Sequence, residues 1–372
     1  MTDGQKVDGA NSSAEEKARA RDSAEEMPHP DDKSAVAEKA ARAADFLTNA
    51  PKVGAMAGRA LGIMRARATG KAKPIPMPWP SVASALGGGL WPGLHVLTGT
   101  TGSGKTQFAL QVAFEAACSG VPTLYIGLEL GELDLTARLL ALVEGKVTGK
   151  TPPPWSSMYL GKTADATLER LGREHATTLE GLPLHAEFGP PNGWGSDQLD
   201  KRGRAMREMY PEETPGGRPL LVVLDYLQAV GQSEKERFEL RERIGRAAYD
   251  GRTVARDLGA AVLMISSVSR EGAKRLRVST DADATKKGEA TNPEKTSPAD
   301  LVGLGKESGE IEYAADTVMA LVSGEYEERK PTKKMHLAIA KMRAGRAAWC
   351  ALEFDGSTFT TPEEREERET NL

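Results

Sequence analysis

The chain has 372 residues, with 49 Lys and Arg against 53 Asp and Glu, which gives a formal net charge of -4 at pH 7. This length is typical of about two domains of roughly 150 residues each, and the charge balance means that any nucleic-acid site has to be a local patch. Two cysteines and five histidines exclude a disulfide framework and a Cys/His zinc cluster. No apolar run approaches the ~18 residues of a membrane span, and no apolar signal core is expected at the start, so we expect a cytoplasmic protein that does not contact a membrane.

The first part of the chain divides into a polar tail and a helical linker. Residues 1–33 carry almost no large apolar side chains and cannot offset the entropy of ordering, so we expect a disordered charged tail. Two helices are expected in the linker, residues 34–79: its Ala-rich start favours one, and residues 52–73, with six Lys or Arg and no acidic residue, predict a second, basic one. The prolines of PIPMPWP (74–80) end helical structure, so we expect a domain to begin at residue 80.

From this boundary onward, short apolar runs alternate with helical stretches. Continuous apolar strands connected through helices are typical of a parallel sheet that is covered on both faces. The sequence therefore predicts an α/β domain over residues 80–361, with a mostly parallel central sheet flanked by helices. The five expected strands cover residues 94–98, 123–128, 220–224, 261–266 and 317–322.

Three segments interrupt this alternation. Residues 145–217 contain the motifs PPPW, GPPNGWG and PEETPGG, which predict loops around a single helix over 196–209. Residues 270–300 are polar and without periodicity, so we expect a long mobile loop of the kind that often serves function. The acidic C-terminal tail, residues 362–372, is expected to be a solvated face or disordered.

One motif carries a specific chemistry. The sequence GTTGSGKT, placed after a predicted strand and before a helical segment, matches the phosphate-binding P-loop pattern in full. Its glycines let backbone N–H groups turn around a phosphate, Lys105 can reach the β- and γ-oxygens of ATP, and the hydroxyl of Thr106 can bind Mg²⁺. A glycine-rich turn that binds nothing is the alternative, but the flanking strand and helix favour the P-loop. The motif consists of Gly99, Thr100, Thr101, Gly102, Ser103, Gly104, Lys105 and Thr106.

Two carboxylates are placed to complete an ATP site. Asp225 closes the apolar run LLVVLD, and we predict that it binds the metal, because a P-loop needs an acidic partner for Mg²⁺; capping a helix is the alternative. Glu129 follows the strand expected over 123–128, so it lies at the same sheet edge as the phosphates. It can orient the attacking water as a general base, whereas a surface glutamate that begins a helix is the alternative.

The order of five segments resembles the C-terminal motor domain of DnaB-type replicative helicases, in the RecA-like group of ATPases. The P-loop comes first, followed by LE at 128–129 and DYLQ at 225–228. KESGEIEYAAD (306–316) and KMRAG (341–345) are similar to the fourth and fifth family motifs. The resemblance covers residues 80–361.

The resemblance implies a RecA-like fold and roles for further residues. Members of the family hydrolyse ATP with Mg²⁺ between the subunits of a ring, which implies that Lys341 and Arg343 reach the γ-phosphate held by a neighbouring subunit. It also implies that Gln228 belongs to the nucleotide site. Lys341 and Arg343 alternate along an expected strand and so share one face; without the resemblance, both read as ordinary surface residues.

Two departures from the family pattern bear on function. The family carries a glutamine thought to sense the γ-phosphate where this chain has Ser267, whose side chain is too short for that role. The globular domain that docks primase in the family has no expected counterpart before residue 80. This pattern is closer to a stand-alone motor of a plasmid, phage or other mobile element than to a housekeeping helicase.

Two basic segments are candidate DNA contacts. The first residues of the expected loop face the central channel in the resembled family, so we expect Arg270, Lys274, Arg275 and Arg277 to contact a phosphate backbone; a solvated charged face is the alternative. The loop has no aromatic residue, which predicts weak sequence dependence. For the basic helix over 52–67, we favour docking on a neighbouring subunit. The alternatives are nucleic-acid binding and, least consistent with its small side chains, an anionic membrane.

These features predict an ATP-dependent DNA motor, a homo-oligomer expected to be a hexameric ring that translocates on single-stranded DNA in replication. ATP and Mg²⁺ are the expected substrate and cofactor, and a loader or replication initiator is a possible partner. One alternative is a DNA-binding or regulatory ATPase of the RecA/RadA or KaiC type, which does not unwind. Another is a nucleotide-dependent assembly platform that recruits proteins through its charged tails.

Overall fold

The computed structural model describes eight stretches of the chain, and the predicted disordered tail (1–33) and most of the first linker helix lie outside them. The chain divides into two compact units, Met1–Met64 and Arg65–Leu372. None of the described helices is long and apolar enough to cross a membrane. The described residues are 37, 52–189, 194–212, 217–231, 239–278, 290–303, 308–324 and 332–370, without the side chains of 270, 271, 308 and 367–370.

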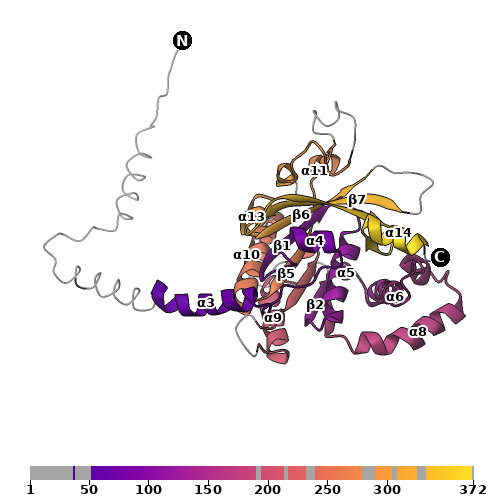
Figure 1. The fold of residues 1–372 in the computed structure, drawn as a ribbon, viewed down its shortest axis with the longest axis horizontal. Helices are drawn as coiled ribbons and strands as arrows, with labels where there is room; N and C mark the ends of the chain where they lie inside the picture. The colour runs from indigo at the N-terminus through magenta and orange to yellow at the C-terminus, as the bar shows by residue number, and fades with distance from the viewer. Residues whose placement is uncertain are drawn as a thin grey trace, which may run out of the picture. The chain divides into compact units, whose positions relative to one another are not determined.

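Strands and helices alternate along the chain (Figure 1). In chain order the elements are α3 (Val53–Ala68), α4 (Pro80–Ala85), β1 (Gly93–Gly99), α5 (Lys105–Cys118), β2 (Thr123–Gly127), α6 (Glu132–Thr148), α7 (Trp155–Tyr159), α8 (Asp165–Glu180), β3 (Leu184–Phe188), α9 (Asp197–Met209), β4 (Leu221–Asp225), η1 (Leu227–Ala229), α10 (Leu240–Leu258), β5 (Ala261–Ser267), α11 (Arg270–Arg275), η2 (Pro298–Leu301), α13 (Ser308–Ala314), β6 (Thr317–Ser323), β7 (Lys333–Met342), β8 (Ala348–Phe354), β9 (Phe359–Thr360) and α14 (Pro362–Thr370).

A nine-stranded sheet forms the centre of the larger unit, in the order β3-β2-β4-β5-β1-β6-β7-β8-β9. The pairings from β3 to β6 are parallel, whereas β7, β8 and β9 are added in antiparallel fashion. The predicted α/β class with a mostly parallel sheet is therefore confirmed. All five predicted strands are present within one residue at each end, as β1, β2, β4, β5 and β6.

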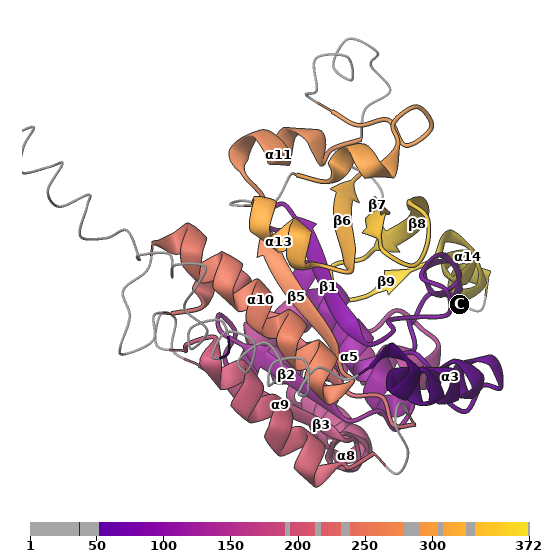
Figure 2. The ribbon, with the colours of Figure 1, turned by 90° about the vertical axis from the view of Figure 1, so that its left-hand side faces the viewer.

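Helices cover both faces of this sheet (Figures 1 and 2). One apolar core lies under α9, α10 and α13, and the other lies under α4, α5 and α6. Because side chains alternate along a strand, Val222 of β4 belongs to the first core and its neighbour Val223 to the second. Strands buried on both faces explain the continuous apolar runs of the sequence.

The proline segment before α4 packs into the second core. Ile75 pairs with Leu90, and Trp79 is fully buried. The Trp79 ring stacks on Phe108 with 4.5 Å between centroids, and its Nε1–H donates to the carbonyl of Phe359 at 3.0 Å. The prolines therefore end the linker helix without separating this segment from the folded unit.

The insert at residues 145–217 contains more regular structure than expected. The helix predicted over 196–209 is present as α9, but the expectation of loops is wrong for α8 and for the edge strand β3. The buried residues of α8 are Leu171 and His175. Because so few of its residues are buried, the segment is polar and its sequence gives little indication of a helix. In β3 no residue is fully buried, which weakens the apolar signal of a strand.

The expected mobile loop over 270–300 is also partly wrong. Helix α11 and the short helix η2 form at its two ends, and they are anchored by Leu276 and Leu301, which are fully buried. Val278 and Thr291 form a bridge between the two ends. Residues 279–289 lie outside the described residues.

The acidic C-terminal segment forms helix α14 through Thr370. Its start is fixed by reciprocal bonds: the Thr361 hydroxyl accepts from the Glu364 N–H, and the Glu364 carboxylate accepts from the Thr361 N–H, as in a capping box. Arg365 is buried and lies 3.9 Å from the Asp355 carboxylate. One side of the segment is thus packed, while Glu363 is exposed.

We expect Trp79→Ala to lower the free energy of unfolding by roughly 3–5 kcal/mol, because it leaves a cavity in place of a buried aromatic side chain. Urea unfolding followed by circular dichroism measures this loss. Trp91→Ala is the matched control: Trp91 is partly exposed, beneath the guanidinium of Arg67, and its loss should stay within about 1 kcal/mol. Equal losses for the two variants would contradict the place of Trp79 in the core.

Candidate active site

The predicted P-loop joins the carboxyl end of β1 to the start of α5. Gly104, directly before α5, has φ +89°, which a side chain rarely tolerates. A Cβ on Gly104 would lie 2.8 Å from the ring of Phe359, and a Cβ on Gly99 would lie 2.6 Å from Ser103 Oγ. The loop therefore has room for backbone alone at these two positions, as a cradle of N–H groups requires.

Two side chains of the loop suit a phosphate. The Lys105 ammonium donates to the carbonyls of Gly99 (2.9 Å) and Thr100 (2.8 Å) and so lies over the loop. Burial lowers the pKa of Lys105, although the charges of nearby carboxylates act in the opposite direction. The Ser103 hydroxyl is buried without a hydrogen-bond partner among the described residues, so a donor is available to an anion.

Asp225 lies at the end of β4 and is almost fully buried, 2% exposed. Burial raises the pKa of Asp225, while hydrogen bonds from the hydroxyls of Tyr125 and Thr106 lower it. Thr106 and Asp225, the pair predicted to bind Mg²⁺, are therefore in direct contact. A hydroxyl beside a carboxylate is a donor set that suits this hard cation.

Tyr125 is a site residue that the sequence analysis missed. It is fully buried in β2, and its hydroxyl donates to Asp225 Oδ2 at 2.7 Å. Burial first, and then the Asp225 charge, raise the pKa of the Tyr125 phenol well above its ordinary value, so the phenol stays a donor. The available signal was a tyrosine inside an otherwise apolar strand, because a buried phenol usually finds a polar partner.

The predicted catalytic residues of the first three motifs meet in one cavity of about 570 Å³. Lys105, Thr106, Glu129 and Asp225 all line it. The Leu128 N–H donates to the Asp225 carbonyl at 2.7 Å, which holds the ends of β2 and β4 side by side. Glu129 is exposed to this cavity, so a water beside the phosphates can contact its carboxylate.

Gln228, predicted to belong to the nucleotide site, does not line this cavity. Its amide nitrogen donates to Ser266 Oγ at 2.8 Å, and its amide oxygen accepts from the Ser267 N–H at 3.1 Å. Of the described residues that line the cavity, Ser267 is one and Gln228 is not. Gln228 therefore contacts the end of β5, beside the cavity, and fixes the residue that replaces the family glutamine.

Lys341 and Arg343 lie at the opposite edge of the sheet from the P-loop, where the parallel strands begin. The Arg343 N–H donates to the Asp316 carbonyl at 2.8 Å, and the Asp316 N–H donates to the carbonyl of Leu94, near the start of β1. The P-loop follows the other end of β1, five residues on from Leu94, or roughly 17 Å at the rise of a strand. The structure does not bring Arg343 to the cavity of its own chain.

The local geometry of this pair differs from the expectation. Strand β7 ends at Met342, so the prediction that Lys341 and Arg343 share one strand face is wrong: Arg343 lies beyond the strand, 51% exposed, with its Nε 3.3 Å from Asp316 Oδ1. The Lys341 ammonium donates to the Glu312 carbonyl of α13. Burial and the neighbouring Arg343 lower the pKa of Lys341.

The candidate DNA contacts lie on and after α11. Lys274 and Arg277 are exposed, whereas Arg275 donates to the Asp300 carbonyl at 2.9 Å. Arg270 begins α11, but its side chain lies outside the described residues, as do Lys306 and Glu307 of the fourth motif. Of the predicted DNA contacts whose side chains the structure describes, Lys274 and Arg277 are thus accessible to a phosphate backbone.

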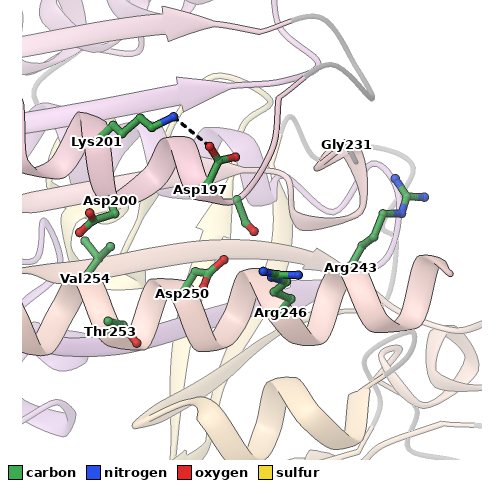
Figure 3. A pocket seen from close by; sticks show the side chains of 10 residues that line it. Asp197, Asp200, Lys201, Gly231, Arg243, Arg246, Asp250, Thr253 and Val254 are labelled. Carbon is green, nitrogen blue, oxygen red and sulfur yellow. Dashed lines mark hydrogen bonds and ion pairs between the residues drawn. The ribbon is translucent and has the colours of Figure 1, made fainter. Parts of the chain in front are cut away.

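A second cavity, of about 380 Å³, lies between α9 and α10 (Figure 3). Three acidic and three basic side chains line it, and Lys201 is paired with Asp197 at 3.0 Å. Because these charges compensate one another, the cavity does not favour an anion. The P-loop cavity, with its ammonium group and its glycine cradle, is the candidate active site.

Residues 83–361 match the family model of the DnaB-like helicase C terminal domain. The chain belongs to this family. No curated protein matches this DnaB-like chain. Among solved structures it is similar to the ATPase domain of another protein, with a TM-score of 0.63 and 18% identity over 83% of this chain and 99% of that domain. It is also similar to a DnaB-like replicative helicase described with its interactions with primase, with a TM-score of 0.61 and 18% identity over 84% of this chain and 67% of that one.

We expect Tyr125→Phe to destabilise this DnaB-like domain by roughly 1–3 kcal/mol at neutral pH, because the buried Asp225 carboxylate loses a donor. Since burial raises the pKa of Asp225, stability already falls as the pH rises from the ordinary carboxyl range through the raised pKa. Removing a donor that lowers this pKa enlarges the loss on the alkaline side of that window. At acidic pH, below the raised pKa of Asp225, the carboxyl is protonated and the difference between variant and parent should shrink.

Urea unfolding at the two pH values measures this effect. Tyr159→Phe is the control, since Tyr159 is exposed on α7 and should change stability at neither pH. The same loss for Tyr125→Phe at both pH values would show that the phenol acts by packing rather than through the Asp225 charge.

Proposed function

We propose that this domain is an ATP hydrolase that works as a ring and moves along single-stranded DNA. The observation that carries the proposal is the division of the catalytic groups between two edges of one sheet. The P-loop, Glu129 and Asp225 lie at the carboxyl edge, whereas Arg343 lies at the amino edge. A second copy that presents its amino edge to this cavity would complete the site, as the ring of the family does.

Each group has a role that follows from its place. The N–H groups of the P-loop and Lys105 hold the phosphates, and Glu129 accepts a proton from the attacking water. Thr106 and Asp225 would hold Mg²⁺, which neutralises phosphate charge when it is bound. Arg343 from a neighbouring subunit stabilises the charge of the transferring phosphoryl group, and its Lys341 adds a second cation.

In this proposal, a short segment of the chain joins the nucleotide cavity to the residues that contact DNA. Strand β5 ends at Ser267 in the cavity, and α11 begins three residues later. Lys274 and Arg277 are exposed on and after that helix, where they can contact a phosphate backbone. Gln228, which bonds to Ser266 and Ser267, would carry a change at the nucleotide to this segment in place of the absent family glutamine.

Helix α3 supports assembly in this proposal. None of its residues is buried, and Val53, Leu61 and Met64 are among the exposed large apolar side chains. We place α3 on a neighbouring subunit, where these side chains would leave water. DNA binding by its arginines is the alternative use of this helix.

A RecA/RadA- or KaiC-like ATPase that does not unwind is the second candidate, because Ser267 departs from the family at the coupling position. Strand displacement on a forked duplex separates the two: a helicase releases the labelled strand when ATP is present, and the second candidate binds DNA without release. Lys105→Ala is the control for ATP dependence. Loaders, initiators and other proteins recruited by the charged tails are further proposed partners.

We expect Lys105→Ala to lose hydrolysis together with tight nucleotide binding, because it removes the cation of the phosphate cradle. Glu129→Gln should lower the rate by roughly 10²–10⁴ and retain binding, because the cradle is intact. Phosphate release and titration with a fluorescent ATP analogue measure the two properties. Glu132→Gln, the same change on an exposed residue of α6, should leave both unchanged. A Glu129→Gln variant that no longer binds ATP would show a structural role instead.

The division between two edges predicts complementation between inactive variants. Arg343→Ala and Lys105→Ala should each be nearly inactive, since an arginine finger is worth on the order of 10³–10⁵ in rate. In a mixed ring, some interfaces pair the intact P-loop of the first variant with the intact Arg343 of the second. Hydrolysis should therefore partly return on mixing.

Arg346→Ala, which removes a nearby exposed arginine, should be active without mixing. Light scattering reports whether the two variants assemble together. A co-assembled mixture that stays inactive would exclude the action of Arg343 across an interface.

A further inference from the structure

The P-loop cavity continues past the phosphate cradle along a second wall. Lys105 and Thr106 line one part of the cavity, and Arg138, Trp155 and Phe354 line another. The roles proposed for the phosphate site do not use the aromatic groups of this wall, and the guanidinium of Arg138 is engaged by neighbouring side chains. Trp155 comes from the insert at residues 145–217, to which the family motifs assign no role.

Arg138 of α6 is held rigidly within this wall. Its Nε donates to Asp134 at 2.6 Å, and its Nη1 donates to Gln107 Oε1 at 3.1 Å. Its guanidinium carbon lies 3.6 Å from the centre of the Trp155 ring, so the planar cation is stacked on the indole. With 13% of its side chain exposed, Arg138 joins the first turn of α5 to α7.

Trp155 is fixed from the other side by the turn between β8 and β9. Its indole N–H donates to the Gly356 carbonyl at 2.9 Å, and its backbone N–H donates to Ser357 Oγ at 3.2 Å. Phe354, in the same wall, stacks on Phe359 with 4.3 Å between ring centroids. The wall is therefore preorganised before any ligand arrives.

Gln107 provides a second, independent indication of a ligand. It follows Thr106 directly, is 1% exposed, and lines the same cavity. Its oxygen accepts from Arg138, but its amide nitrogen has no hydrogen-bond partner among the described residues. An unpaired buried donor is costly unless a ligand supplies the acceptor.

We propose that Trp155, stacked with Arg138, forms the surface against which the base of the bound nucleotide packs. The ligand class is a nucleoside triphosphate rather than a bare polyphosphate. This inference rests on the proposed function, because it requires that the P-loop holds the phosphates. Packing of a base on an aromatic or guanidinium plane strengthens binding by roughly ten- to a hundredfold. The insert thereby gains a role in ligand recognition.

The test compares ATP with inorganic tripolyphosphate, which has the phosphates and lacks the base. Both are titrated into the full chain with Mg²⁺ by isothermal calorimetry. Trp155→Ala should weaken ATP binding about tenfold or more and leave tripolyphosphate binding unchanged. Trp155→Phe, which keeps an aromatic face, should recover most of the ATP affinity, and Leu160→Ala, at an exposed residue just after α7, should match the parent.

The outcomes distinguish failure of the base-packing proposal from failure of the proposed phosphate-binding function. If Trp155→Ala weakens both ligands equally, the tryptophan supports the fold of the cavity and does not contact the base. If it weakens neither, the base lies elsewhere, and in both cases the phosphate-binding function stands. If the parent protein binds neither ATP nor tripolyphosphate, the P-loop assignment fails, and the base wall fails with it.

Discussion

In a parallel sheet every strand ends at the same edge, and this constraint brings together the phosphate-binding half of the site. β1, β2, β4 and β5 run in the same direction, so the P-loop, Glu129, Asp225 and Ser267 arrive at a common cavity although they are far apart in sequence. β7 runs in the opposite direction, so Arg343 is delivered to the other edge. No rearrangement of loops alone reverses the direction of a strand, so the proposed mechanism divides the catalytic groups between two chains.

The buried charges of the cavity depend on this geometry as well. Asp225 is taken out of water at the end of β4, which raises its pKa, and Lys105 is partly buried beside it, which lowers the lysine pKa. Each charge offsets part of the desolvation of the other, and Tyr125 supplies a further donor to the carboxylate from the adjacent strand. The site is therefore organised by contacts between neighbouring strands.

The sequence predicts those features that depend on local pattern. Each of these patterns lies within one short segment: the apolar runs of β1 and β4, and the spacing of the P-loop. Together they place the phosphate cradle and Asp225 correctly at one edge of the sheet. The Tyr125–Asp225 contact joins residues 100 positions apart, so a tyrosine in an apolar strand indicates a polar partner but cannot identify it as Asp225. The stack of Arg138 on Trp155 could not be predicted either, because the two residues lie in different helices, α6 and α7. The catalytic roles of Glu129, Lys341 and Arg343 stay predictions.

In the proposed mechanism, a single chain lacks a complete ATP site. The most direct measurement is the hydrolysis rate per subunit as the protein is diluted through the range in which sedimentation shows association. If Arg343 acts across an interface, the rate per subunit rises with association and falls toward zero for isolated subunits. A rate per subunit that stays constant from monomer to assembly would contradict it, because every catalytic group would then be supplied within one chain.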